Sequence, residues 1–159
     1  MMFIIGFISC LIVIGIIGIV MMPRFGKFFF VKDDSRISFE DTLETIRKNV
    51  DTNDKGWFIT SEKDYNLTYR KNEKGELPFR LVEFKIGNSN HSYPVNRVFP
   101  ALATFMPSAL AVVEYRDGNV VIYRKNTGLL GRFFSGVIRK VMTKEVPVDM
   151  DELLQGIIK

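Results

Sequence analysis

The stretch ALAVVEYRDGNVVIY, residues 109–123, decides how this chain folds. Two runs rich in β-branched and apolar residues flank Asp117-Gly118, a dipeptide that readily adopts the positive φ angles of a tight turn. An Asp-Gly pair between two such runs is a strong local signal for a β-hairpin. We therefore expect two adjacent antiparallel strands here, and we place the other elements around them.

Helical spacing marks a segment near the start of the domain. Ser38 followed by Asp41 has the form of a capping box, and apolar residues then recur every three or four positions up to Val50. This spacing predicts a helix from Ser38 to Val50 that buries one face. Further strands are expected at residues 28–32, 57–60 and 79–86.

Weaker patterns assign the remaining segments. Residues 61–76 are charged and irregular, which favours a loop or a frayed helix, and residues 88–94 are turn-like. Helices are expected at 95–104, at 127–142 and at 149–158. Strands and helices in this order predict an α+β domain, in which helices pack on one face of a single antiparallel sheet.

Composition limits the chemistry that this chain of 159 residues can perform. One Cys and one His exclude an internal disulfide framework, a Cys-rich metal site and a His-cluster metal site. A net charge of +4 at pH 7 predicts no particular partner. No glycine-rich phosphate loop is present, since Gly128, Gly131 and Gly136 lie in or beside an apolar helix. We expect a non-catalytic domain without a metal site or a nucleic-acid partner.

An uncharged apolar run covers residues 3–22 and ends at Pro23-Arg24. As a helix it would reach about 30 Å, the thickness of the hydrocarbon core of a bilayer. Its start lacks the basic residues of a secretory signal, so we expect an uncleaved single-pass anchor, in which Gly15 and Gly18 let another helix approach closely. The expected boundaries are an anchor at 1–23, a juxtamembrane linker or first strand at 24–35, and a soluble domain at 36–159.

Several motifs, taken in order, resemble the family called domain of unknown function 302. They are Met106-Pro107-Ser108, Val113-Glu114-Tyr115 leading into Asp117-Gly118, and the run NTGLLGRF at residues 126–133. Residues 39–46 and Gly56-Trp57 match the first helix and strand of the family, so the likeness covers about residues 36–154. The resemblance implies a fold like that of the TATA-box-binding protein, in the order β-α-β4-α, without its DNA-binding role.

The family pattern also has two cysteines that this chain lacks. One follows the third strand and the other stands in a Met-Pro-Cys run, and these positions correspond to Gly87 and Ser108. Thiol redox chemistry, thiolate metal ligation and sulfur transfer therefore do not carry over. Family members often have an exporting anchor or leader, which favours an extracytoplasmic domain on the cytoplasmic membrane. Basic residues after the apolar run, beginning with Arg24 and Lys27, favour the cytoplasmic side instead.

The candidate ligand-binding residues are Asn88, His91, Met106 and Ser108. Asn88 matches a polar residue that often follows the first family cysteine. His91 and Met106 would together supply the axial ligands of a haem, an arrangement known in proteins. His91 and Ser108 would be the base and nucleophile of a hydrolase, although no glycine elbow surrounds the serine. The plainer alternative for His91 is a solvated histidine in a turn.

Residues 124–144 carry six basic and no acidic side chains. On a helix with a broad apolar arc, this stripe suits a membrane surface or a groove on a partner protein. It equally suits a core helix with a solvated basic edge. The six residues are Arg124, Lys125, Arg132, Arg139, Lys140 and Lys144.

These patterns predict a membrane-anchored, non-catalytic accessory domain that docks to a membrane protein complex or forms a homodimer. The first alternative is a carrier of a small apolar ligand or of haem, with a pocket near the four candidate residues. A hydrolase that uses Ser108 and His91 is the more remote alternative.

Overall fold

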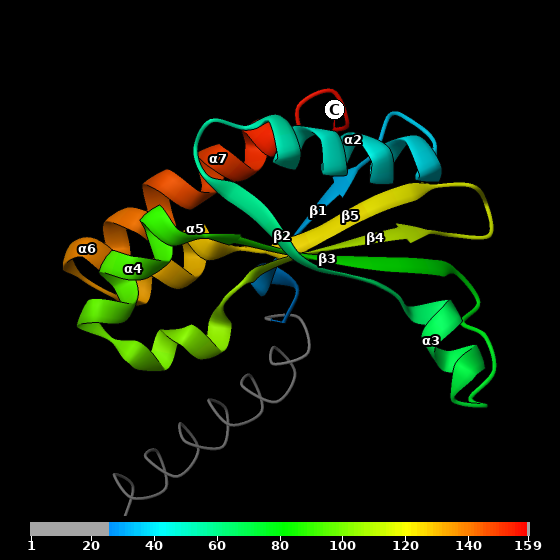
Figure 1. The fold of residues 1–159 in the computed structure, drawn as a ribbon, viewed down its shortest axis with the longest axis horizontal. Coiled ribbons are helices and arrows are strands. Elements are labelled where there is room, and N and C mark those ends of the chain that lie inside the picture. Colours follow the sequence, from blue (N-terminus) through cyan, green and yellow to red (C-terminus); the bar gives the residue numbers. More distant parts are fainter. Residues whose placement is uncertain (1–25, 159) are drawn as a thin grey trace, which may run out of the picture.

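Five antiparallel strands form one sheet in the computed structural model, which describes residues 26–158 (Figure 1). Their order across the sheet is β1-β5-β4-β3-β2, so β4 lies in the centre and β1 and β2 form the edges. The strands are β1 (Phe30–Asp34), β2 (Trp57–Asp64), β3 (Arg80–Asn88), β4 (Ser108–Glu114) and β5 (Val120–Lys125). A single antiparallel sheet with helices confirms the predicted α+β class.

The hairpin of β4 and β5 forms where the sequence predicts it. Gly118 has a φ of +82°, and its N–H donates to the carbonyl oxygen of Tyr115 at 2.9 Å. A side chain would be strained at this φ, so the turn depends on glycine. The turn sets the register in which Val112 faces Ile122, and both of these side chains are fully buried.

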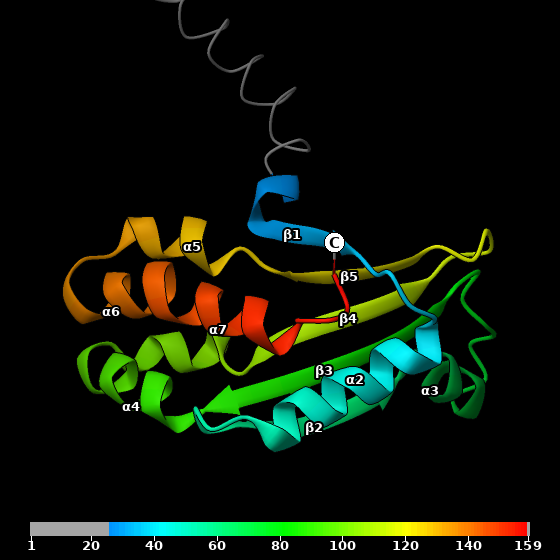
Figure 2. The same cartoon turned by 90° about the horizontal axis from the view of Figure 1, so that it is seen from above.

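Helix α2 (Phe39–Thr52) begins at the predicted capping box. The Ser38 hydroxyl accepts from the Asp41 N–H at 3.2 Å and donates to the Asp41 carboxylate at 2.6 Å. Figures 1 and 2 show α2 lying over one face of the sheet. The side chains that it buries there are Phe39, Thr42, Leu43, Ile46 and Val50, as the apolar spacing predicts.

The charged stretch at 61–76 is more regular than expected. Strand β2 continues to Asp64, whose carboxylate accepts from the Leu67 N–H at 2.9 Å and so begins helix α3 (Tyr65–Lys71). Figure 1 shows α3 on the side of the sheet away from α2. The expectation that helices lie on one face therefore holds for α2 and not for α3.

The segment predicted as a turn at 88–94 is helical instead. Asn88 accepts from the N–H groups of Asn90 and His91 and thereby begins helix α4 (Ser89–Val98). Pro94 lies inside this helix rather than before it, and the 3₁₀ helix η2 (Pro100–Phe105) follows. The sequence reading missed that Asn88 acts as a helix cap, one of the commonest roles of asparagine.

The single helix predicted at 127–142 is wrong. The chain forms α5 (Thr127–Leu130) and η3 (Gly131–Phe133), turns at Gly136 with a φ of +59°, and returns through α6 (Gly136–Lys140) and the π-helical turn η4 (Val141–Glu145). The second half buries Ile138 and Val141, whereas the first half leaves Phe133 75% exposed, so the apparently continuous apolar arc did not mark one buried face. Helix α7 (Val146–Leu153) follows directly, earlier than the predicted 149–158.

The helices after β3 and β5 gather beyond one end of the sheet (Figure 2). Neighbouring strands run antiparallel, so β3 and β5 finish at the same end of the sheet at which β1, β2 and β4 begin. Strands β2, β3, β4 and β5 therefore each contribute residues near one of their ends to one place. This place, between the strand ends and α4, η2, α5 and η4, contains the candidate site.

The predicted anchor at residues 3–22, together with Gly15 and Gly18, lies outside the described residues. Within residues 26–158, no helix is both long enough and apolar enough to cross a membrane.

Candidate functional site

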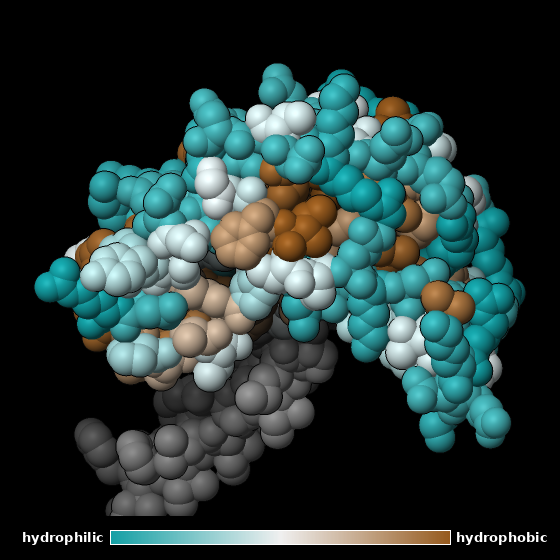
Figure 3. All heavy atoms as spheres, viewed as in Figure 1, coloured by the Kyte–Doolittle hydropathy of each residue, from teal (hydrophilic) through white to brown (hydrophobic). Residues whose placement is uncertain are grey.

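A cavity of about 310 Å³ lies between the strand ends and the helices beyond them. Most of its wall is apolar, contributed by residues such as Ile86, Val95, Leu102, Leu130, Val141 and Val146. Phe58 and Phe105 also line it, and both are about half exposed, so they mark the side that faces solvent. Figure 3 shows apolar side chains gathered along β2 and around η2 on this face of the molecule.

All four residues predicted to bind a ligand line this one cavity. Asn88 ends β3, His91 lies in the first turn of α4, Met106 follows η2, and Ser108 begins β4. Ser108 reaches the cavity because the sheet register places it opposite the buried Ile86. The structure thus brings together residues from the end of β3, from the helical connection that follows it and from the start of β4.

Asn88 is buried and shapes the site through hydrogen bonds. Its side-chain oxygen caps α4, and its side-chain nitrogen donates to the carbonyl oxygen of Lys55 at 3.0 Å. Asn88 therefore ties the start of α4 to the loop before β2. Since these bonds occupy its amide group, its part in the site is to position His91 one helical turn away.

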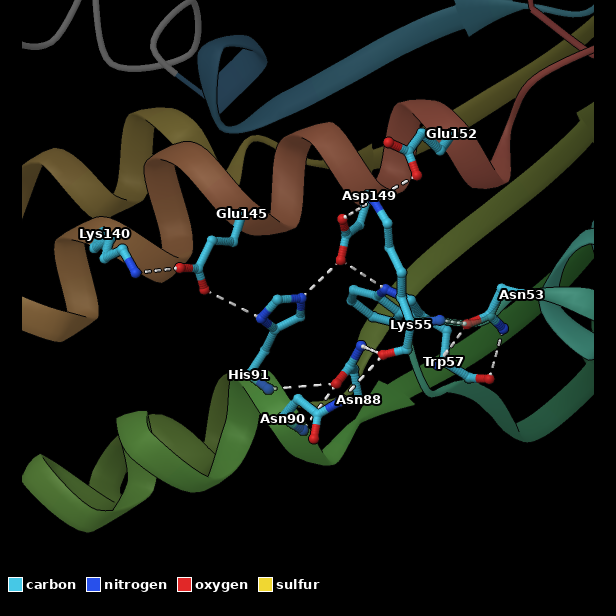
Figure 4. A network of polar contacts seen from close by, with 10 residues as sticks. All are labelled: Asn53, Lys55, Trp57, Asn88, Asn90, His91, Lys140, Glu145, Asp149 and Glu152. Atoms are coloured by element: carbon cyan, nitrogen blue, oxygen red, sulfur yellow. Dashed lines mark hydrogen bonds and ion pairs between the residues drawn. The ribbon is translucent and has the colours of Figure 1, made fainter.

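His91 stands between two carboxylates from the C-terminal helices (Figure 4). Its Nε2 lies 2.7 Å from Asp149 Oδ2, and its Nδ1 lies 3.3 Å from Glu145 Oε2. Trp57 packs against the imidazole with 5.5 Å between ring centroids, and its Nε1 donates to Asp149 Oδ2 at 3.0 Å. The contacts of His91 with these carboxylates thus connect α4 to η4 and α7 on the polar side of the cavity.

Asp149 is the centre of this network and is itself buried. Burial alone would raise the pKa of its carboxyl, but hydrogen bonds from His91, Lys55 and Trp57 lower it by more, so the pKa lies below its ordinary value. Lys55 Nζ lies 2.9 Å from Asp149 Oδ1. Hydrogen bonds to Glu152 and then to Asp149 raise the pKa of Lys55 above its ordinary value. Asp149 is therefore ionised at neutral pH and well compensated.

The same geometry bears on the two chemical alternatives. Both ring nitrogens of His91 face carboxylates, so in this conformation neither is available to take a proton from Ser108 or to coordinate a haem iron. In the described part of the chain, no group of three His, Cys, Asp or Glu side chains is arranged to hold a metal ion.

Lys125 lines the cavity from the end of β5. Its Nζ donates to the carbonyl oxygens of Phe105 and Pro107, and burial lowers the pKa of this amine below its ordinary value. No carboxylate among residues 26–158 lies within ion-pair distance of it; the twelve ion pairs there involve other residues. Lys125 is therefore a half-buried cation beside an apolar cavity.

Asn96 is another polar residue of the cavity wall. Its side-chain oxygen is buried and has no hydrogen-bond partner in the described structure. A buried acceptor without a partner costs about 1–3 kcal/mol, so such atoms in native proteins commonly meet a ligand or an ordered water.

The other members of the predicted basic stripe do not form one surface. Arg124 lies on the opposite face of β5 from Lys125, where it pairs with Asp33 and Asp151 at 2.8 and 2.7 Å. Lys140 pairs with Glu145 at 2.9 Å. Arg132, Arg139 and Lys144 are exposed on separate turns of the folded-back helical segment. The stripe was continuous only on the assumption of a single helix at 127–142.

No protein-family model matches the sequence of this chain, and no curated protein matches it either. Among solved structures it is similar to the uncharacterized conserved protein DUF302 from Bacillus stearothermophilus, with a TM-score of 0.65 and 14% identity over 79% of this chain and 98% of that one. The fold is that of a DUF302 protein. This confirms the DUF302-like fold that the sequence motifs implied, whereas the likeness to the TATA-box-binding protein stays a prediction, and at this identity the comparison shows the fold alone.

Sequence reasoning missed the partners of His91. Asp149 lies 58 positions further along the chain and Glu145 lies in a segment predicted to connect two helices. A buried aspartate leaves no local trace, because its spacing from other acidic residues looks like that of a solvated helix face. Lys125 was identified only as part of the basic stripe, and its place beside the cavity follows from the β5 register.

Proposed function

We propose that this domain binds a small, mainly apolar molecule in the cavity between the sheet end and helices α4, η2, α5 and η4, without catalysing a reaction. The proposal depends on one observation: the four residues predicted to bind a ligand all line a single apolar cavity. The unpartnered oxygen of Asn96 lies on the same wall, and a hydrogen-bond donor that enters the cavity, from an occupant or from a water molecule bound with it, would satisfy that atom.

The size of the cavity indicates the size of the ligand. An apolar cavity of about 150 Å³ holds benzene, which has six carbon atoms. A volume of about 310 Å³ is twice that, so it suits a molecule of about twelve non-hydrogen atoms. This volume is at the lower end of the range of small-molecule sites, roughly 300–1,000 Å³.

The test uses the fluorescence of Trp57, which is the one tryptophan of the chain and lines the cavity. Bromine quenches a tryptophan only on close contact, so 10-bromodecan-1-ol, a neutral molecule of suitable size, reports occupancy of the cavity rather than of a micelle or bilayer. We expect saturable quenching of the full-length protein in detergent at a stoichiometry of one.

Two variants on β4 control this experiment. Ser108→Phe places a large ring in the cavity and should abolish the saturable quenching. Ala111→Phe adds the same ring on the opposite face of the strand, between Glu83 and Tyr123, which do not line the cavity, and should leave the quenching intact. Equal quenching in both variants would contradict the proposal.

A second proposal is attachment to a membrane through residues 3–22, with docking to a membrane protein. The observation that favours it is the exposure of Phe28 and Phe30, at 59% and 58%, only a few residues beyond the apolar run. Gentle detergent extraction followed by mass spectrometry of the purified protein tests it. Stoichiometric larger membrane subunits are expected, and a consistently solitary protein would contradict it.

A further inference from the structure

Lys125 indicates what kind of molecule the cavity would accept. An ammonium group has three N–H donors, and the carbonyl oxygens of Phe105 and Pro107 account for two of them. One N–H donor of Lys125 is therefore left without a partner among these contacts. No carboxylate of the described chain lies within 4 Å of the ammonium group to compensate its charge. The charges that act on it are those of Glu83 and Lys85, which lie on the same face of the sheet and are of opposite sign to one another.

A cation in this position is costly without a ligand. Burial lowers the pKa of Lys125, which expresses the cost of holding the charge beside an apolar wall. The cost is removed when an anion joins the ammonium, since charge-assisted hydrogen bonds are roughly twice as strong as neutral ones. Two other polar residues of the cavity do not compete for an anion, because His91 already faces two carboxylates and Asn88 is occupied by its backbone bonds.

Resting on the proposed function, we infer that the ligand is an apolar carboxylic acid of medium chain length, whose carboxylate pairs with Lys125 while its hydrocarbon part fills the cavity. Decanoic acid has twelve non-hydrogen atoms, the number that the volume suggests. A phospholipid with two acyl chains has several times as many and does not fit. The cavity offers one cation beside an apolar wall. It would therefore select a ligand with one negative charge and an apolar body.

The test compares 10-bromodecanoic acid with 10-bromodecan-1-ol as quenchers of Trp57 at pH 7. A hydrogen bond to a charged group predicts that the acid binds roughly 10- to 100-fold more tightly than the alcohol. Lys125→Met keeps the length of the side chain and removes the charge, so the acid should lose this preference while the alcohol still binds. Lys125→Arg, which restores the charge, should restore part of the preference.

Lys85→Met is the matched control, because Lys85 lies on the same face of the sheet and does not line the cavity. It should keep the preference for the acid. Equal affinities of acid and alcohol for the unmodified protein, or a preference that survives Lys125→Met, would overturn the inference and leave the proposed function standing. Quenching by neither molecule would overturn the proposed function and the inference together. Saturable quenching by bilayers of brominated phosphatidylglycerol that Ser108→Phe abolishes would overturn the inference in favour of a lipid ligand.

Discussion

A single carboxylate, that of Asp149, connects three parts of the chain that are remote in sequence. It accepts from Trp57 on β2 and from Lys55 in the loop before it, and it faces His91 on α4. None of these bonds is to the backbone of its own helix. The connections on the polar side of the cavity therefore depend on the charge of one side chain, that of Asp149.

The pH dependence of stability should report this charge. Because the pKa of Asp149 is lowered in the folded state, its contribution is fully present above the unfolded value of about 3.9 and is lost as the pH falls through the folded value. We expect Asp149→Asn to reduce the free energy of unfolding by about 2 kcal/mol at pH 7 and by progressively less below about pH 4. Urea unfolding at several pH values measures this. A difference in the free energy of unfolding that does not change with pH would contradict this expectation. The control is Glu152→Gln, at a half-exposed partner of Lys55, which should reduce the free energy of unfolding by less than about 1 kcal/mol.

At the scale of elements, the segment from Thr127 to Glu145 shows how far a local pattern can mislead. Apolar pairs spaced by four residues predict one long helix, but Gly131 and Gly136 allow the chain to fold back on itself. A Cβ at Gly131 would lie 2.6 Å from Met142 Cβ, so the close approach of η3 to η4 requires glycine. The capping box of α2 and the Asp-Gly hairpin were predicted correctly because each depends on contacts between near neighbours.

Two glycine variants test the folded-back arrangement. Gly131→Ala should destabilise the protein by about 1–3 kcal/mol, because the added methyl group overpacks the contact with Met142 and Thr143. Gly128→Ala should be neutral or stabilise by up to about 1 kcal/mol, since its nearest neighbours would be at 3.6 and 3.8 Å and alanine favours the helix. Urea midpoints measure both. Equal effects at the two positions would support one continuous helix instead.

At the scale of the whole molecule, Arg124 joins the first strand to the last helix. Its side chain pairs with Asp33 on β1 and with Asp151 on α7, and the Arg36 N–H donates to the Ile157 carbonyl oxygen at 2.8 Å nearby. Edge strand β1 is thus held on the sheet by the C-terminal segment. Arg124 was predicted to lie on a partner surface, and this network gives it a structural role in the isolated chain.

Arg124→Met should lower the free energy of unfolding by about 2–3 kcal/mol, because it leaves the largely buried carboxylate of Asp33 without a partner. Asp151→Ala should cost less than about 1 kcal/mol, since that carboxylate is 61% exposed. Thermal or urea unfolding distinguishes the two. Similar losses would mean that the ion pair with Asp151, rather than the burial of Asp33, carries the effect.

The fold class and the four cavity residues could be predicted from the sequence, whereas the site as a whole could not. Asn88 and Ser108 were chosen from the resemblance of the sequence to a family, and His91 and Met106 from the chemistry of their side chains, while nothing in the spacing of the four required them to meet. Lys125, Asn96 and Asp149 acquire their roles only from the register of β5, the length of α4 and the path of the chain after Gly131. These depend on three-dimensional packing between segments that share no sequence pattern.

The first residue of β1, Phe30, pairs with Lys125, so the chain enters the fold beside the cavity. Between residue 22 and Gly26 a polypeptide extends at most about 14 Å, at about 3.5 Å per residue, and the 3₁₀ helix Gly26–Phe29 adds about 8 Å. If residues 3–22 lie in a bilayer, this short connecting segment keeps the cavity within one membrane thickness of the lipid headgroups. A hydrophobic acid leaving the bilayer would then meet the cavity almost at once, and its slow escape into bulk water would no longer limit capture.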